Sequence, residues 1–128
     1  MAVLPTGHPP AGRREVPLVA LADESIVVHP SRDRSSMHGR VLAACARAGF
    51  EPSAPVEVGE SATLVVFVAA GHGVALVPES VQSLRLDGVT YLPFVETEAV
   101  DLGLARRAGP NSPAAEQVAV VIEACVRR

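Results

Sequence analysis

The chain has 128 residues, of which 48% are apolar and 3% aromatic, with no tryptophan and a formal net charge of −3. This length fits one domain, or a small domain plus part of another, with a core of Val, Leu and Ala. All eleven basic residues are arginine and they form no basic stripe, so we expect no direct binding to nucleic acid. No segment reaches the roughly 20 apolar residues of a membrane span, and no signal-peptide pattern opens the chain.

The two cysteines, Cys45 and Cys125, lie far apart in the sequence. Cys45 falls on the apolar side of a predicted helix, so we expect a buried free thiol there and no disulfide. A reducing cytoplasm fits this expectation, and the prediction is a cytoplasmic protein without a membrane partner.

Short apolar runs and punctuating prolines define the first third of the chain. The expected elements are a strand at Ala2–Leu4, an exposed loop at Thr6–Glu15, a helical turn at Pro17–Ala22, a buried strand at Ser25–His29 and a helix at Ser36–Ala48. Ser35 or Ser36 suits the N-cap of that helix. Gly49 suits its C-terminal cap, because glycine adopts a positive φ at little cost.

The middle of the chain predicts a further strand–helix–strand unit. Pro55–Val58 alternates, with Glu57 facing solvent, and Ser61 caps a helix that extends to about Ala70. This helix is apolar all round and should be buried, although its pattern alone also allows a strand. Gly71 and Gly73 allow positive φ before a strand at Val74–Val77. Strands that alternate with helices predict an α/β fold with a mostly parallel sheet flanked by helices.

The last third of the sequence predicts elements with less regular apolar patterns. These are a helical turn at Glu79–Ser83, strands at Val89–Pro93 and Val100–Arg106, and a helix capped by Ser112 with Pro113 at its first position. The apolar stripe of this helix comprises Ala115, Val118, Ala119, Ile122 and Cys125 or Val126.

The order and wording of these segments resemble the effector-binding domain of LysR-type transcriptional regulators. The main match is the stretch Phe67–Ser80, FVAAGHGVALVPES, in which Phe67 stands where leucine is common. The supporting segments are VLPTGHPPA near the N-terminus, IVVHPS (Ile26–Ser31), AGFEP (Ala48–Pro52), GVTYLPF and LGLARR (within Gly88–Arg107). The resemblance covers essentially the whole chain, and no single motif in it is diagnostic.

The resemblance implies a type 2 periplasmic-binding-protein-like fold with two subdomains. Residues of about 16–83 would form a complete second subdomain, and 1–15 with 84–128 would form the crossover and part of the first. Neither the winged helix-turn-helix of the family nor the first half of its first subdomain is recognisable, so the resemblance describes residues 1–128 as a truncated fragment without a DNA-binding domain.

Two helix starts are candidate effector-binding sites. Arg34, Ser35, Ser36 and Met37 offer an arginine, two hydroxyls and free backbone N–H groups, which suit a carboxylate or a phosphate. The second start, at Ser61, can face the same cleft, and the resemblance places the first loop beside the effector. The alternative for both starts is ordinary N-capping by serine, which is common.

Other chemistry-bearing residues form no catalytic or metal-binding pattern. His8, His29, His38 and His72 lack metal-ligand spacing, and His72 is interpreted as a turn residue. Acidic pairs such as Glu96 and Glu98 are interpreted as solubilising loop residues. We therefore expect neither an enzyme nor a bound metal or cofactor.

Two functions are compatible with these features of the sequence. The first is a regulatory domain that senses a small polar or anionic metabolite in a cleft between its subdomains. The alternative is a protein-interaction fragment that forms a homo-oligomer or pairs with a full-length regulator through exposed sheet edges and apolar surface.

Overall fold

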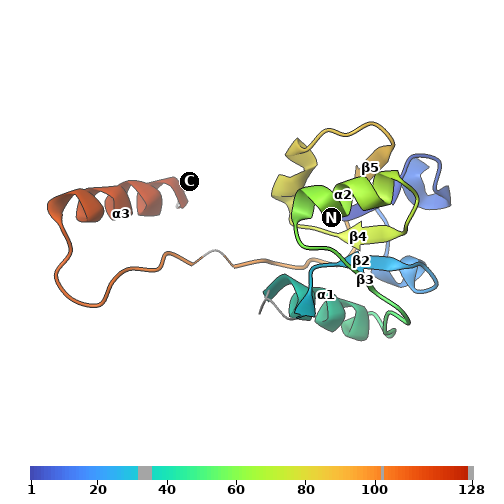
Figure 1. Cartoon of the computed structure of the whole chain (residues 1–128), viewed down its shortest axis with the longest axis horizontal. Helices are drawn as coiled ribbons and strands as arrows, with labels where there is room; N and C mark the ends of the chain where they lie inside the picture. Colours follow the sequence, from blue (N-terminus) through green and yellow to red (C-terminus); the bar gives the residue numbers. More distant parts are fainter. Residues whose placement is uncertain (32–35, 102, 127–128) are drawn as a thin grey trace. The chain divides into compact units, whose positions relative to one another are not determined.

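The computed structural model describes residues 1–31, 36–101 and 103–126. They fall into two compact units, Met1–Glu98 and Ala99–Arg128. The first unit contains the sheet and its two flanking helices, and the second contains one helix with the segment that leads to it (Figure 1).

A five-stranded mixed sheet forms the centre of the first unit. In the spatial order β3-β2-β4-β1-β5, its strands are Val56–Glu57, Ile26–Val28, Val74–Leu76, Ala2–Pro5 and Val89–Leu92. The strand β2 runs parallel to β3 and β4, which confirms the parallel neighbours expected from the alternation of strands and helices. By contrast, β1 is antiparallel to both β4 and β5.

The two helices α1 (Ser36–Arg47) and α2 (Ser61–Ala69) cover opposite faces of this sheet (Figure 1). Successive strand residues point to opposite faces, so each strand contributes to two cores. In β2, Ile26 and Val28 join the core that includes Cys45 of α1, whereas Val27 joins the core that includes Leu64 of α2. Because both faces are covered at the centre of the sheet, β2 and β4 are continuous apolar runs.

Burial of α2 is restricted to one side. Leu64, Val65 and Val68 are buried, while 53% of the Val66 side chain is exposed. The prediction of a helix buried all round is therefore wrong. A single sheet face can cover only one side of a helix, and no second layer lies over α2 within residues 1–98 as the structure describes them.

In the described part of the chain, 3-10 helices form at η1 (Pro9–Gly12), η2 (Leu18–Leu21) and η4 (Glu79–Ser83). The last two occur where the sequence predicted helical turns. The first corrects the expectation of a wholly exposed loop, because Pro10 is buried. His8 fixes this segment from its N-terminal side, since its Nε2 lies 2.8 Å from a carboxylate oxygen of Glu24.

The approach of β4 to β2 requires glycine at position 73. Gly73 has a φ of +142°, and a Cβ atom there would lie 2.2 Å from the carbonyl oxygen of Ser25. That carbonyl accepts a hydrogen bond of 2.9 Å from the N–H of Val74. Gly71, at φ +81°, follows the last turn of α2 as expected for its C-terminal cap.

The segment after β5, which ends the first unit, is attached to η2 and α1 by backbone and acidic side-chain contacts. Phe94 forms a parallel bridge with Val16, and Glu96 accepts a 3.0 Å hydrogen bond from the N–H of Leu18. Glu98 accepts two hydrogen bonds, of 3.1 and 2.5 Å, from the guanidinium of Arg47. The interpretation of these acids as merely solubilising is therefore wrong, because they connect this segment to η2 and α1.

The second unit contains α3 (Pro113–Val126). The hydroxyl oxygen of Ser112 accepts a 3.3 Å hydrogen bond from the N–H of Ala115, which confirms the predicted cap. No strand forms at 100–101 or 103–106, so the strand predicted at Val100–Arg106 is wrong for those residues. An alternating pattern forms a strand only beside a partner strand, and none pairs with this segment in the described residues.

The cysteines differ in environment as expected. Cys45 is a buried free thiol, and burial raises its pKa above the ordinary value. Cys125, on α3, is free and exposed.

Substitution of Gly73 by alanine should destabilise the first unit by roughly 2–3 kcal/mol, because the new Cβ collides with the Ser25 carbonyl at a strained φ. Denaturant unfolding followed by circular dichroism measures this change. Gly59→Ala is the matched control, since its added Cβ meets no atom within 4 Å. A G73A variant as stable as the parent would contradict the close approach of the two strands.

Candidate functional site

The first unit gathers polar side chains at the edge of the sheet where β2 and β3 end. These strands are adjacent and parallel, so their carboxyl ends meet at one edge, which is where open α/β sheets commonly bind ligands. The helices α1 and α2 both begin after this edge. The sequence therefore places two helix N-termini beside the residues that follow β2 and β3.

A histidine connects these elements. His29 follows β2 directly, and its Nε2 lies 3.2 Å from the hydroxyl oxygen of Ser61, the first residue of α2. The backbone carbonyl of His29 accepts a hydrogen bond of 2.7 Å from Nδ1 of His38, in the first turn of α1. A carbonyl oxygen only accepts, so Nδ1 of His38 must carry a proton. We call His29, His38 and Ser61 the edge cluster.

The predicted site residues are only partly brought together. Ser61 belongs to the edge cluster and is half-buried, but it does not cap α2 as expected. The N-cap is Glu60, which makes no side-chain capping bond, and the hydroxyl of Ser61 contacts His29 instead. A long-range partner thus replaces the local cap that the sequence pattern indicated.

The other candidates lie in or before α1. Ser36 is the first residue of α1 and is exposed, and Met37, which follows it, is half-buried. Arg34 and Ser35 lie outside the described residues. Their predicted roles stay predictions.

His29 and His38 were missed as members of this site, because the histidines of the chain have no metal-ligand spacing that would single them out. The signal that indicates them is topological. His29 is the first polar residue after a buried parallel strand, and His38 falls in the first turn of the next helix. Both positions belong to the edge where a ligand site is expected.

The first turn of α2 combines backbone N–H donors, at the positive end of the helix dipole, with two nearby carboxylates. The first helical hydrogen bond joins Leu64 N–H to the Glu60 carbonyl at 2.9 Å, so the N–H groups before Leu64 are available to an acceptor. Two exposed acids flank this turn, Glu57 and Glu60. The carboxylate of Glu57 accepts a 3.4 Å hydrogen bond from Ser31 N–H, which occupies one of its oxygens. The edge can therefore bind a polar or anionic group through N–H and O–H donors.

A serine hydroxyl beside an imidazole also forms the first half of a nucleophile–base pair. Catalysis of that kind needs a third group that orients the imidazole. In the described parts of the chain, no side chain contacts the other nitrogen of His29. Among the same residues, no three His, Cys, Asp or Glu side chains are placed to hold one metal ion. No helix among residues 1–31, 36–101 and 103–126 is long and apolar enough to cross a membrane.

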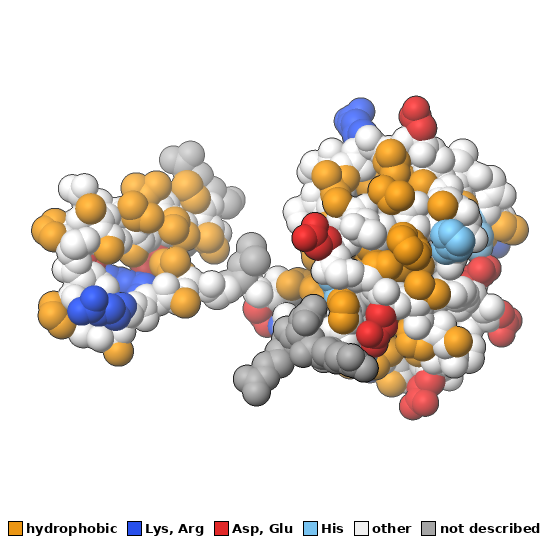
Figure 2. All heavy atoms as spheres, viewed as in Figure 1, with side chains coloured by type: hydrophobic (Ala, Val, Ile, Leu, Met, Phe, Trp, Pro, Cys, Tyr) orange, Lys and Arg blue, Asp and Glu red, His pale blue; other side chains and the backbone are white. Residues whose placement is uncertain are grey.

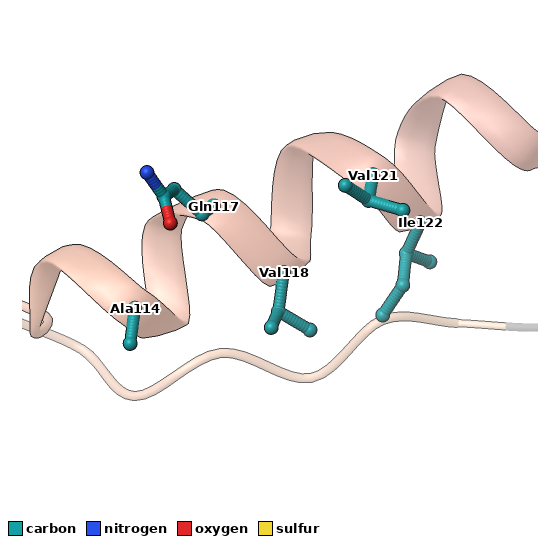
Figure 3. A pocket seen from close by; sticks show the side chains of 5 residues that line it. All are labelled: Ala114, Gln117, Val118, Val121 and Ile122. Carbon is teal, nitrogen blue, oxygen red and sulfur yellow. The ribbon is translucent and has the colours of Figure 1, made fainter.

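The second unit has an apolar hollow of about 390 Å³ along α3. It is lined by Ala114, Gln117, Val118, Val121 and Ile122 (Figure 3). Ala114, Val118 and Ile122 point toward the segment that passes beside the helix (Figure 3). This segment is attached by Arg106, whose guanidinium donates to the carboxylate of Glu116; that bond, together with one from Asn111, lowers the pKa of Glu116. Gln117 is its one polar lining residue, so the hollow suits an apolar group better than a polar ligand.

The family model described as the LysR substrate binding domain matches residues 1–125. Among curated relatives, the chain is 34% identical over 123 residues to the HTH-type transcriptional regulator CatR of Pseudomonas putida, covering 95% of this chain and 42% of CatR. It is 35% identical over 80 residues to the HTH-type transcriptional regulator BenM of Acinetobacter baylyi, covering 62% of this chain and 26% of BenM. The chain thus spans less than half the length of these relatives.

Two solved structures show the same fold. The BenM effector binding domain with its effector benzoate matches with a TM-score of 0.69 and 33% identity, over 75% of this chain and 44% of that one. HinK, a LysR family transcriptional regulator from Pseudomonas aeruginosa, matches with a TM-score of 0.73 and 22% identity, over 95% of this chain and 44% of that one. The sheet and helices of the first unit therefore have the effector-domain architecture.

Replacement of Ser61 by alanine should lower the free energy of unfolding by about 1 kcal/mol, because Nε2 of His29 loses its protein partner. Ser36→Ala is the matched control and should change it by less than about 0.5 kcal/mol, since Ser36 is exposed and, like Ser61, is the first residue of its helix. Urea unfolding of both variants measures the difference. Equal losses of stability in the two variants would contradict a stabilising hydrogen bond between Ser61 and His29.

Proposed function

Because this chain belongs to the LysR substrate binding domain family, we propose that it binds a small polar or anionic effector at the edge cluster. The effector would lie against the N-terminal turns of α1 and α2, where the candidates Ser36, Met37 and Ser61 occur. The candidates Arg34 and Ser35 precede α1 in the sequence and stay predictions. The single observation that carries this proposal is the contact between His29 and Ser61, which directs donors from two elements to one edge of the sheet.

Binding, and not catalysis, is the role that the edge cluster supports. Helix N-termini, hydroxyls and imidazoles are donors suited to a carboxylate. The relatives CatR and BenM are transcriptional regulators, and benzoate, the effector of BenM, is a small carboxylate. An aromatic carboxylate is therefore the first ligand to test on this chain.

Effector binding would regulate the protein by changing the arrangement of its two subdomains. Residues of about 16–83 would act as one subdomain, and 1–15 with 84–128 as the crossover and part of another. A ligand that prefers one arrangement of the subdomains shifts the equilibrium toward it. In a complete regulator, this shift would change DNA binding through the oligomer, whereas this chain itself would not contact DNA.

Benzoate should raise the melting temperature of the purified chain, because a ligand that binds only the native state stabilises it, by about 2.7 kcal/mol at 100 times its dissociation constant. Differential scanning calorimetry across benzoate concentrations measures the increase. Benzamide, which has the same ring without the charge, is the control ligand. If neither benzoate nor a panel of other small carboxylates changes the transition, the proposed function is wrong.

One further observation favours a protein-interaction role, alone or alongside effector binding. The helix α3 exposes large apolar side chains, and Figure 2 shows hydrophobic side chains gathered over this unit. The exposed side chains are Val118, Val120, Val121, Ile122 and Val126. An apolar surface of this kind is typical of a contact with another polypeptide, which would be a second copy or a full-length regulator.

Self-association should therefore occur and should depend on α3. Val121 is 61% exposed, so Val121→Glu should lower the association constant by at least about tenfold, because it puts a charge into the apolar contact. Sedimentation equilibrium over a range of concentrations measures it. Val19→Glu is the control, because Val19 is 53% exposed on the first unit. A parent chain that stays monomeric at high concentration contradicts this second role.

A further inference from the structure

We infer that His29 is the positioning residue of the edge cluster: its Nε2–H donates to Ser61, which leaves the Ser61 hydroxyl proton available to the effector. This inference rests on the proposed function and adds a specificity determinant to it. His29 was not among the candidate effector-binding residues, and its role would be exerted through Ser61.

The position of His29 is fixed at two points. Its backbone carbonyl accepts the 2.7 Å hydrogen bond from Nδ1 of His38, which attaches it to α1. Its ring lies 3.2 Å from the Ser61 hydroxyl, which attaches it to α2. His29 and Ser61 are both half-buried. The imidazole is thus held between the two helix starts.

The direction of the hydrogen bond follows from the protonation forms of the ring. Nε2 carries a proton in the imidazolium and in the Nε2–H neutral form, and it accepts only in the Nδ1–H form. Among the described residues, Nδ1 of His29 meets no carbonyl or carboxylate that would hold a proton there. His38 differs, because a carbonyl fixes its Nδ1–H. With no described group to hold a proton on Nδ1, we assign the proton of His29 to Nε2, which then donates to Ser61.

The consequence concerns which ligand groups Ser61 can recognise. A serine hydroxyl has one proton and two acceptor lone pairs. When Nε2–H of His29 donates to a lone pair of the Ser61 hydroxyl, the proton of that hydroxyl is free to donate to a carboxylate. The carboxylate would lie beside the N–H groups of the first turn of α2. If Ser61 instead donated to His29, only its lone pair would face the ligand, and that would repel an anion. His29 thus selects for acceptor groups on the effector.

The test uses ¹⁵N-labelled full chain and benzoate as the probe. The imidazole nitrogen shifts of His29, assigned by His29→Gln, should show a protonated Nε2 in the free protein and in the complex. Benzoate affinity, measured by calorimetry, should fall about tenfold in Ser61→Ala and in His29→Phe. The double variant should lose no more than either single one, because the two side chains act as a unit. His29→Gln should recover part of the affinity, since its amide can donate.

The outcomes separate this inference from the proposed function. An unprotonated Nε2 in the free protein, or benzoate binding that is unchanged in both single variants, overturns the inference while effector binding stands. Absence of benzoate binding by the parent chain counts against the proposed function, and the nitrogen shifts still decide the direction of the hydrogen bond. Val66→Ala, an exposed change on α2 beyond its first turn, is the control and should leave the affinity unchanged.

Discussion

The pairing of β4 with β2 is the constraint on which the first unit depends. It begins where the N–H of Val74 meets the carbonyl of Ser25, a contact that only a residue without a side chain at position 73 allows. This pairing and that of β2 with β3 place β2 at the centre of the parallel strands. The end of β2, and with it His29, is therefore located by backbone hydrogen bonds on both sides.

The same arrangement explains why the polar residues gather at one edge. Both helices follow parallel strands and return over opposite faces, so their N-terminal turns begin at the carboxyl ends of the strands. The adjacent parallel strands β2 and β4 are wholly apolar and buried. The imidazole of His29 lies where β2 ends, and its contact with Ser61 connects that end to the start of α2.

Local chemistry in the sequence was enough to predict the strands and α-helices of this unit, although not the 3-10 helix η1. The β-branched run before His29 predicted β2, and Gly71 and Gly73 predicted the positive φ angles between α2 and β4. The predictions failed where a long-range partner decides the structure. Ser61 contacts His29 in place of capping α2, and Glu98 contacts Arg47. Residues 100–101 and 103–106 lack a partner strand, so an alternating pattern did not become a strand.

Mapping of backbone amide shifts during a benzoate titration tests the central claim most directly, because it reports where the ligand lies. We expect the largest changes at residues 29–31, 36–38 and 61–63, on three segments that meet at one edge of the sheet. Changes confined to α3 and its apolar hollow, or spread without a maximum at this edge, would contradict the assignment of the effector site to the edge cluster.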